Sequence, residues 1–173
     1  MKSSTQSRRP PVVSIIGKKN SGKTTLLEKL IPELKARGHR VGTVKHDTHG
    51  FDIDHEGKDT YRHKASGAEA VVIAAPEKLA LIMDTQREWH PQKIILTYLG
   101  AMDIVLTEGY KSAGLPQVEI FRSAAHKNPL NLKGENENLV ALISDIPIDL
   151  GVPNIALDDL KRLADLIEQR FLK

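Results

Sequence analysis

The stretch Gly17-Lys18-Lys19-Asn20-Ser21-Gly22-Lys23-Thr24 decides the fold of this chain. It has the spacing G-x-x-x-x-G-K-[ST] of a phosphate-binding loop (P-loop). A β-branched run at residues 12–16 precedes it, and a leucine-rich amphipathic stretch at residues 26–34 follows it. Strand, loop and helix in this order distinguish a P-loop from a chance glycine- and lysine-rich turn. We therefore predict that the chain binds a nucleoside triphosphate.

The residue types of the loop explain how it would hold phosphate. Gly17 and Gly22 permit the tight bend that brings backbone N–H groups close to phosphate oxygens. Lys23 is the candidate catalytic residue, because its ammonium can reach the β- and γ-phosphates, while the Thr24 hydroxyl can ligate Mg²⁺. The predicted nucleotide-binding residues of this stretch are Gly17, Lys19, Asn20, Ser21, Gly22, Lys23, Thr24 and Thr25.

Outward from the loop, apolar strand-like runs alternate with amphipathic helices. This alternation predicts an α/β fold with a doubly wound, mostly parallel sheet and helices on both faces. The predicted helices are residues 23–37, 59–66 and 85–99, followed by a closing helix capped by Asp158. The helix at residues 85–99 would begin at a capping box at Thr85–Glu88. The predicted strands are residues 12–16, 40–45, 68–75, 78–83, 102–107, 117–121 and 139–144.

Length and composition fit one soluble domain. The 173 residues carry a net charge of +3, contain no cysteine and include no apolar run long enough to span a bilayer. We expect a disordered basic tail at residues 1–11, with no secretory signal, and a single nucleotide-binding domain at residues 12–173. The small, dispersed positive charge argues against a nucleic-acid groove, and a cytoplasmic protein without membrane contact is the simplest interpretation.

Three stretches together resemble one family. They are the P-loop with its paired threonines, the run Thr43-Val44-Lys45-His46-Asp47-Thr48-His49-Gly50 continuing to Gly57-Lys58-Asp59-Thr60, and Thr107-Glu108-Gly109-Tyr110-Lys111. They look like the molybdopterin-guanine dinucleotide biosynthesis protein B (MobB) family, and the likeness extends through Ile143-Ser144-Asp145-Ile146-Pro147. The resemblance implies Mg²⁺–GTP binding with weak GTPase activity. It also implies a dimeric adapter for the nucleotidyltransferase that joins GMP to molybdopterin, with molybdopterin itself a possible ligand.

Residues that follow predicted strands are further site candidates, because ligands gather at the carboxyl ends of parallel strands. Glu108 is expected to hold Mg²⁺ directly or through water; otherwise it is a solvated acid at a strand end. Asp47 lies where switch residues of related GTPases sense the metal, or it caps a turn. Asp145 can accept from the guanine N1 and N2 hydrogens, or it caps a turn.

The loop after the second strand carries several of the chain's histidines. Together with Lys58, His46 suggests contact with an anionic nucleotide or pterin phosphate. A solvated loop and a transition-metal site, for which imidazole is a suitable ligand, stay open as alternatives. The metal interpretation would fit a nickel-insertion GTPase, although the absence of cysteine and of an Asn-Lys-x-Asp guanine-reading motif counts against it. A small-molecule kinase is a further alternative.

Overall fold

The computed structural model describes residues 9–132 and 136–172. These residues form two compact units. One comprises the described residues of Met1–His46 and His90–Lys173, and we call it the sheet unit; the other, Asp47–Trp89, we call the hairpin unit. Most of the predicted N-terminal tail, residues 1–8, lies outside the described residues. The single domain at residues 12–173 stays a prediction.

The sheet unit is built on six strands in the order β2-β5-β1-β6-β7-β8, and every neighbouring pair runs parallel. This confirms the predicted mostly parallel α/β sheet. The strands β7 and β6 begin and end at the predicted residues, whereas the short edge strand β8 was not predicted. The bounds are β1 Val12–Ile16, β2 Val41–Lys45, β5 Ile104–Glu108, β6 Gln117–Phe121, β7 Leu139–Ser144 and β8 Asn154–Ala156.

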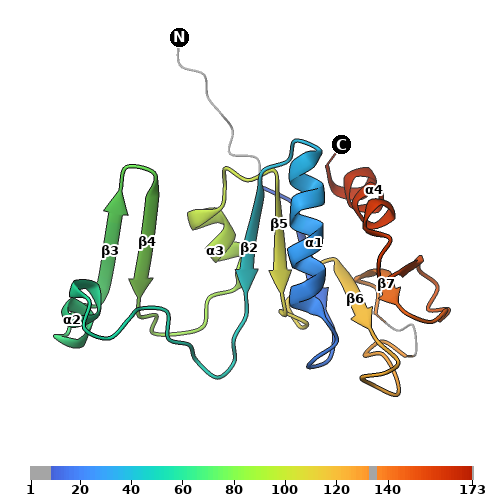
Figure 1. The fold of residues 1–173 in the computed structure, drawn as a ribbon, viewed down its shortest axis with the longest axis horizontal. Coiled ribbons are helices and arrows are strands. Elements are labelled where there is room, and N and C mark those ends of the chain that lie inside the picture. The colour runs from blue at the N-terminus through green and yellow to red at the C-terminus, as the bar shows by residue number, and fades with distance from the viewer. Residues whose placement is uncertain (1–8, 133–135, 173) are drawn as a thin grey trace, which may run out of the picture. The chain divides into compact units, whose positions relative to one another are not determined.

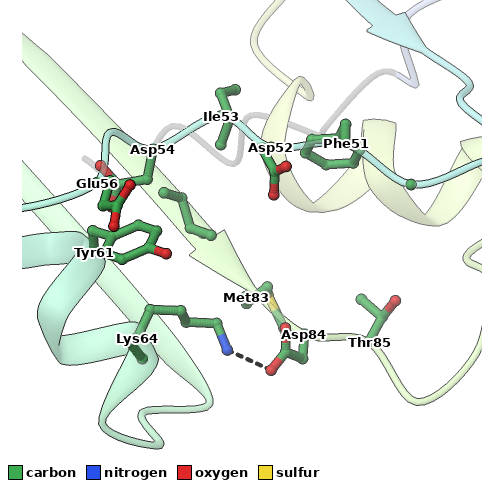
Figure 2. A pocket seen from close by; sticks show the side chains of 13 residues that line it. Phe51, Asp52, Ile53, Asp54, Glu56, Tyr61, Lys64, Met83, Asp84 and Thr85 are labelled. Carbon is green, nitrogen blue, oxygen red and sulfur yellow. Dashed lines mark hydrogen bonds and ion pairs between the residues drawn. The ribbon is translucent and has the colours of Figure 1, made fainter.

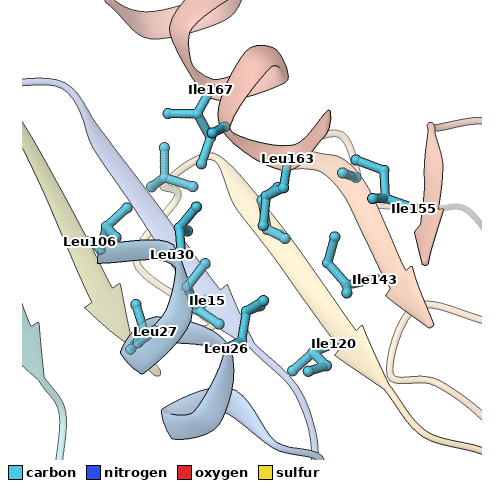
Figure 3. Packing of buried hydrophobic residues seen from close by; sticks show 14 of the residues in the cluster. Ile15, Leu26, Leu27, Leu30, Leu106, Ile120, Ile143, Ile155, Leu163 and Ile167 are labelled. Atoms are coloured by element: carbon cyan, nitrogen blue, oxygen red, sulfur yellow. The ribbon is translucent and has the colours of Figure 1, made fainter. Parts of the chain in front are cut away.

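Helices cover both faces of this sheet (Figure 1). On one face, α1 (Lys23–Ala36) and α4 (Leu160–Phe171) bury Leu30 and Leu163 against Ile15 of β1 in a single cluster (Figure 3). On the other face, α3 (Pro91–Tyr98) contributes Ile95 to a smaller cluster. Alternate residues of each strand point to opposite faces, so one strand can supply both cores. Among the described residues, none of the helices is long and apolar enough to cross a membrane.

Two predicted helix starts are wrong. The capping-box pattern at Thr85–Glu88 does not begin a helix; α3 starts at Pro91, after His90 in an extended conformation with ψ 140°. Proline is favoured at the first helical position, and it disfavours helical geometry in the residue before it. The closing helix is capped by Asp159 rather than Asp158, since the Asp159 side chain accepts a hydrogen bond from the backbone N–H of Arg162.

The hairpin unit contains α2 (Asp59–Ala65) and a two-stranded antiparallel sheet, β3 (Ala70–Ala75) and β4 (Lys78–Met83). Both strands were predicted, but they do not join the parallel sheet. Their apolar side chains remain largely exposed, with Val72 56% and Leu79 69% accessible. Val72 and Leu79 project from the same side of the hairpin, because Val72 pairs with Leu81 and Ala74 pairs with Leu79.

Candidate functional site

The P-loop connects the buried strand β1 to helix α1, as predicted. Gly22 sits directly before the helix with φ 96°, a left-handed conformation that suits glycine. At Gly17, a Cβ atom would lie 2.6 Å from the carbonyl oxygen of Ile120, so the loop leaves no space for a side chain there. The hydroxyl oxygen of Ser21 is buried and has no hydrogen-bond partner among the described residues. A buried group of this kind fits a loop that receives a ligand.

Lys23 lies at the start of α1 and folds back over the loop. Its Nζ donates to the carbonyl oxygens of Lys18 at 2.9 Å and of Gly17 at 3.3 Å. Burial lowers the pKa of Lys23, and the nearby carboxylate of Glu108 partly opposes that shift. The ammonium is therefore held above the loop where a phosphate would be cradled, with loop carbonyls as its present partners. A phosphate oxygen is a stronger partner for this cation than a carbonyl.

Thr24 and Glu108 meet beside the loop. The Thr24 hydroxyl lies 3.2 Å from both Oε1 and Oε2 of Glu108. The parallel pairing of β1 with β5 places Glu108 opposite Ile15, just before the P-loop. A hydroxyl and a carboxylate are oxygen ligands of the type that Mg²⁺ takes when it bridges to nucleotide phosphates. The residues present therefore fit a magnesium ion, and Thr24 and Glu108 are the groups that would hold it.

His46 lies next to this pair within the sheet unit. Its backbone N–H donates to the carbonyl oxygen of Glu108 at 2.9 Å, and its ring stacks on Tyr110 with centroids 4.4 Å apart. Asp47 and Lys58 belong to the hairpin unit, whereas the P-loop belongs to the sheet unit. The Asp47 carboxylate accepts from the backbone N–H of His49 at 2.9 Å, which is the geometry of a turn cap. The roles proposed for His46, Asp47 and Lys58 stay predictions.

A segment after β6 lies against the P-loop, and sequence reasoning did not select it. His126 Nε2 donates to the carbonyl oxygen of Lys19 at 2.6 Å, while Lys18 Nζ donates to that of Asn128 at 2.7 Å. Arg122, the first residue after β6, has its guanidinium beside Gly22. Its position directly after an apolar strand could have identified Arg122 from the sequence, because the same rule selected Glu108 and Asp145.

Asp145 follows β7 and is bound to this same segment. Its carboxylate accepts from the backbone N–H of Ser123 at 2.9 and 3.2 Å and from the Ser123 hydroxyl at 2.9 Å. The backbone hydrogen bond from Ser123 lowers the pKa of Asp145, and the positive charge of Arg122 adds to the shift. Asp145 is therefore a fixed, ionised acceptor at the carboxyl end of β7. Its proposed reading of guanine stays a prediction.

The hairpin unit has its own open pocket of about 920 Å³ (Figure 2). Phe51, Tyr61 and Met83 provide apolar walls, and the ion pair of Lys64 with Asp84 lies at one side. The other charged lining residues are acidic: Asp52, Asp54 and Glu56. The lining therefore favours apolar or cationic groups over anions. Within residues 9–132 and 136–172, His, Asp and Glu side chains do not gather in any group of three or more that could hold a metal ion.

The parallel sheet, the P-loop between β1 and α1, and the oxygen ligands beside it define a P-loop NTPase-like α/β protein. The family model "Molybdopterin guanine dinucleotide synthesis protein B" (MobB) matches residues 12–145. The chain belongs to this family, as the sequence motifs indicated.

Curated relatives extend this match over nearly the whole chain. The "molybdopterin-guanine dinucleotide biosynthesis adapter protein" of Escherichia coli is 34% identical, with 94% of each chain covered. The Haemophilus influenzae protein of the same name is 35% identical over 91% of this chain and 88% of its own length. A crystal structure of molybdopterin-guanine biosynthesis protein B matches at 31% identity with a TM-score of 0.71, covering 91% of this chain and 98% of that one.

Proposed function

We propose that this protein is a Mg²⁺–GTP-binding adapter in molybdenum cofactor biosynthesis. Its role would be to assist a partner guanylyltransferase that attaches GMP to molybdopterin. The names of the Escherichia coli and Haemophilus influenzae relatives, and the near-complete coverage of both, support the adapter role. GTP hydrolysis is expected to be weak, as the family resemblance implies, and the cytoplasm is the expected location.

The Thr24–Glu108 pair is the observation that carries the nucleotide part of this proposal. Bound Mg²⁺ would neutralise charge on the β- and γ-phosphates. Thr24 and Glu108 would supply its protein oxygen ligands, while Lys23 exchanges its loop carbonyls for phosphate oxygens. The loop amides and the N-terminus of α1 would bind and orient the remaining phosphate oxygens. These groups bind and position the nucleotide.

A homodimer is also part of the proposal. The hairpin unit exposes apolar side chains of its two-stranded sheet, with Val72 and Leu79 on one side and Ile73 on the other. A two-stranded hairpin is marginal by itself and leaves strand edges open to pairing. A second copy of the chain would bury this apolar surface, which supports self-association through the hairpin unit.

Calorimetric titration with GTP, ATP and molybdopterin, each with and without Mg²⁺, tests the proposed function. We expect GTP to bind more tightly than ATP, and Mg²⁺ to strengthen the binding. Lys23→Ala should weaken GTP binding about ten- to hundredfold, because charged hydrogen bonds contribute roughly 1.5–3 kcal/mol each. Lys29→Ala, at an exposed position of the same helix, is the matched control. Unchanged affinity in Lys23→Ala would contradict the proposed P-loop function.

A further inference from the structure

Arg122 stands at the junction of three strand ends. It directly follows β6, which lies between β1 and β7 in the sheet. The P-loop follows β1 and Asp145 follows β7, so Arg122 lies between the phosphate-binding loop and the candidate base-reading residue. A nucleotide that spans these two sites would pass its sugar and its α-phosphate across this position.

The guanidinium is held close to the loop backbone. A Cβ atom placed on Gly22 would lie 3.2 Å from Nε and 3.5 Å from Nη2 of Arg122. Its Nε is buried and has no hydrogen-bond partner among the described residues. A buried N–H without an acceptor is costly, and a charged one more so. An anionic group that arrives with a ligand would supply the missing acceptor.

The backbone around Arg122 is firmly positioned. The next residue, Ser123, is held by Asp145, and the Arg122 carbonyl accepts from the backbone N–H groups of Ala125 and His126 at 3.1 Å. Farther along, the buried carboxylate of Glu119 accepts from the backbone N–H of Asn131 at 3.1 Å. A fixed backbone lowers the entropy lost when a side chain meets a phosphate, and a guanidinium suits phosphate geometry.

We propose that Arg122 is a further nucleotide ligand, which donates from its guanidinium to the α-phosphate of the bound nucleotide. This inference rests on the proposed nucleotide binding and adds to it a contact that the P-loop motif does not include. Since the α-phosphate is common to GMP, GDP and GTP, the contact strengthens binding of all three. Arg122 would therefore contact a different phosphate from Lys23, which is expected to reach the β- and γ-phosphates.

Calorimetric titration of the full-length protein with Mg²⁺–GTP, GDP and GMP tests this contact. Arg122→Ala and Arg122→Gln should each weaken GTP and GDP binding about ten- to hundredfold, and GMP by a similar factor where its affinity is measurable. Arg122→Lys, which keeps the charge, should recover part of the loss. Arg162→Gln, an exposed arginine on α4, is the matched control and should bind like the parent.

Two further measurements separate a phosphate contact from packing against the loop. The ligand-free Arg122→Gln variant should unfold at the parent's temperature or higher, because the substitution removes a buried charge that lacks an acceptor. Its loss of affinity should shrink at high salt. Unchanged affinity in Arg122→Gln, a loss confined to GTP, or a loss that Arg122→Lys does not reduce would overturn the proposal. If the parent itself binds no guanine nucleotide, the proposed function fails. If the parent binds guanine nucleotides but the Arg122 variants give one of these contrary results, only the inference about Arg122 fails.

Discussion

The Thr24 hydroxyl lies 3.2 Å from both carboxylate oxygens of Glu108, although 84 positions separate the two residues in the chain. Parallel pairing of β1 with β5 creates this proximity, because it carries the end of β5 to the start of the P-loop. The pair supplies both oxygen ligands that the chain is proposed to offer to Mg²⁺.

Glu108→Gln should therefore weaken GTP binding in the presence of Mg²⁺ and leave Mg²⁺-free GDP binding nearly unchanged. A carboxylate close to the cation attracts it, whereas near bare phosphates it only repels. Calorimetric titration with and without Mg²⁺ measures both effects, and Glu28→Gln, at an exposed site on α1, serves as control. Equal losses in the two conditions would show that Glu108 acts structurally.

Base selection depends on Asp145 and on the serine that holds it. Asp145→Asn should reduce the preference for GTP over ATP, because an amide replaces one acceptor of the guanine N1 and N2 hydrogens with a donor. Ser123→Ala should cause a smaller reduction, since it removes the hydroxyl contact but keeps the backbone one. Competition between the two nucleotides measures the ratio. An unchanged ratio in Asp145→Asn would exclude Asp145 from this role.

The core beneath the P-loop helix determines stability. Leu30 is fully buried between α1 and the sheet, so Leu30→Ala should lower the free energy of unfolding by about 2–5 kcal/mol. Lys29→Ala, one position earlier and exposed, should change it by less than about 0.5 kcal/mol. Chemical denaturation of both variants provides the comparison. Similar values for the two would contradict the packing shown in Figure 3.

Acid should weaken the contribution of the Arg40–Asp103 ion pair. Hydrogen bonds from the Arg40 side chain and backbone lower the pKa of Asp103 to about 2, from an ordinary value of 3.8. The stabilisation is therefore present above pH 3.8 and is lost as the pH falls towards 2. Arg40→Gln should be less stable than the parent at pH 5, with the difference shrinking by pH 2.5. Thermal unfolding at both pH values tests this, and a difference independent of pH would disprove it.

Self-association should depend on the exposed apolar side chains of the hairpin, among which Leu79 is the most exposed. Leu79→Lys places a charge on a side chain that is 69% exposed, so the monomer should remain folded while a dimer through this surface should dissociate. Sedimentation at several concentrations measures the change. Glu77→Lys, in the turn between β3 and β4, is the control for added charge. A parent that stays monomeric, or a variant that still dimerises equally, would argue against this interface.

The sequence alone determined the P-loop, the strand before it and the helix after it. This local order follows from residue types: glycines permit the bend, β-branched residues favour β1, and leucines repeat at helical spacing along α1. The same local rules predicted β6, β7 and the hairpin strands. They failed at Thr85–Glu88, where the capping-box pattern predicted the start of a helix. Pro91 disfavours helical geometry in the residue before it, so the helix begins at Pro91 instead.

Only the tertiary structure decided which strand ends share the site. Sequence spacing does not give strand order, so it could not show that β6 lies beside β1 or that Arg122 lies beside Gly22. Nor could it show that β3 and β4 pair only with each other, since their apolar composition also suits a central strand. Pairing between distant strands depends on how the faces of strands and helices pack together. The free energy of that packing cannot be read from any local stretch of residues.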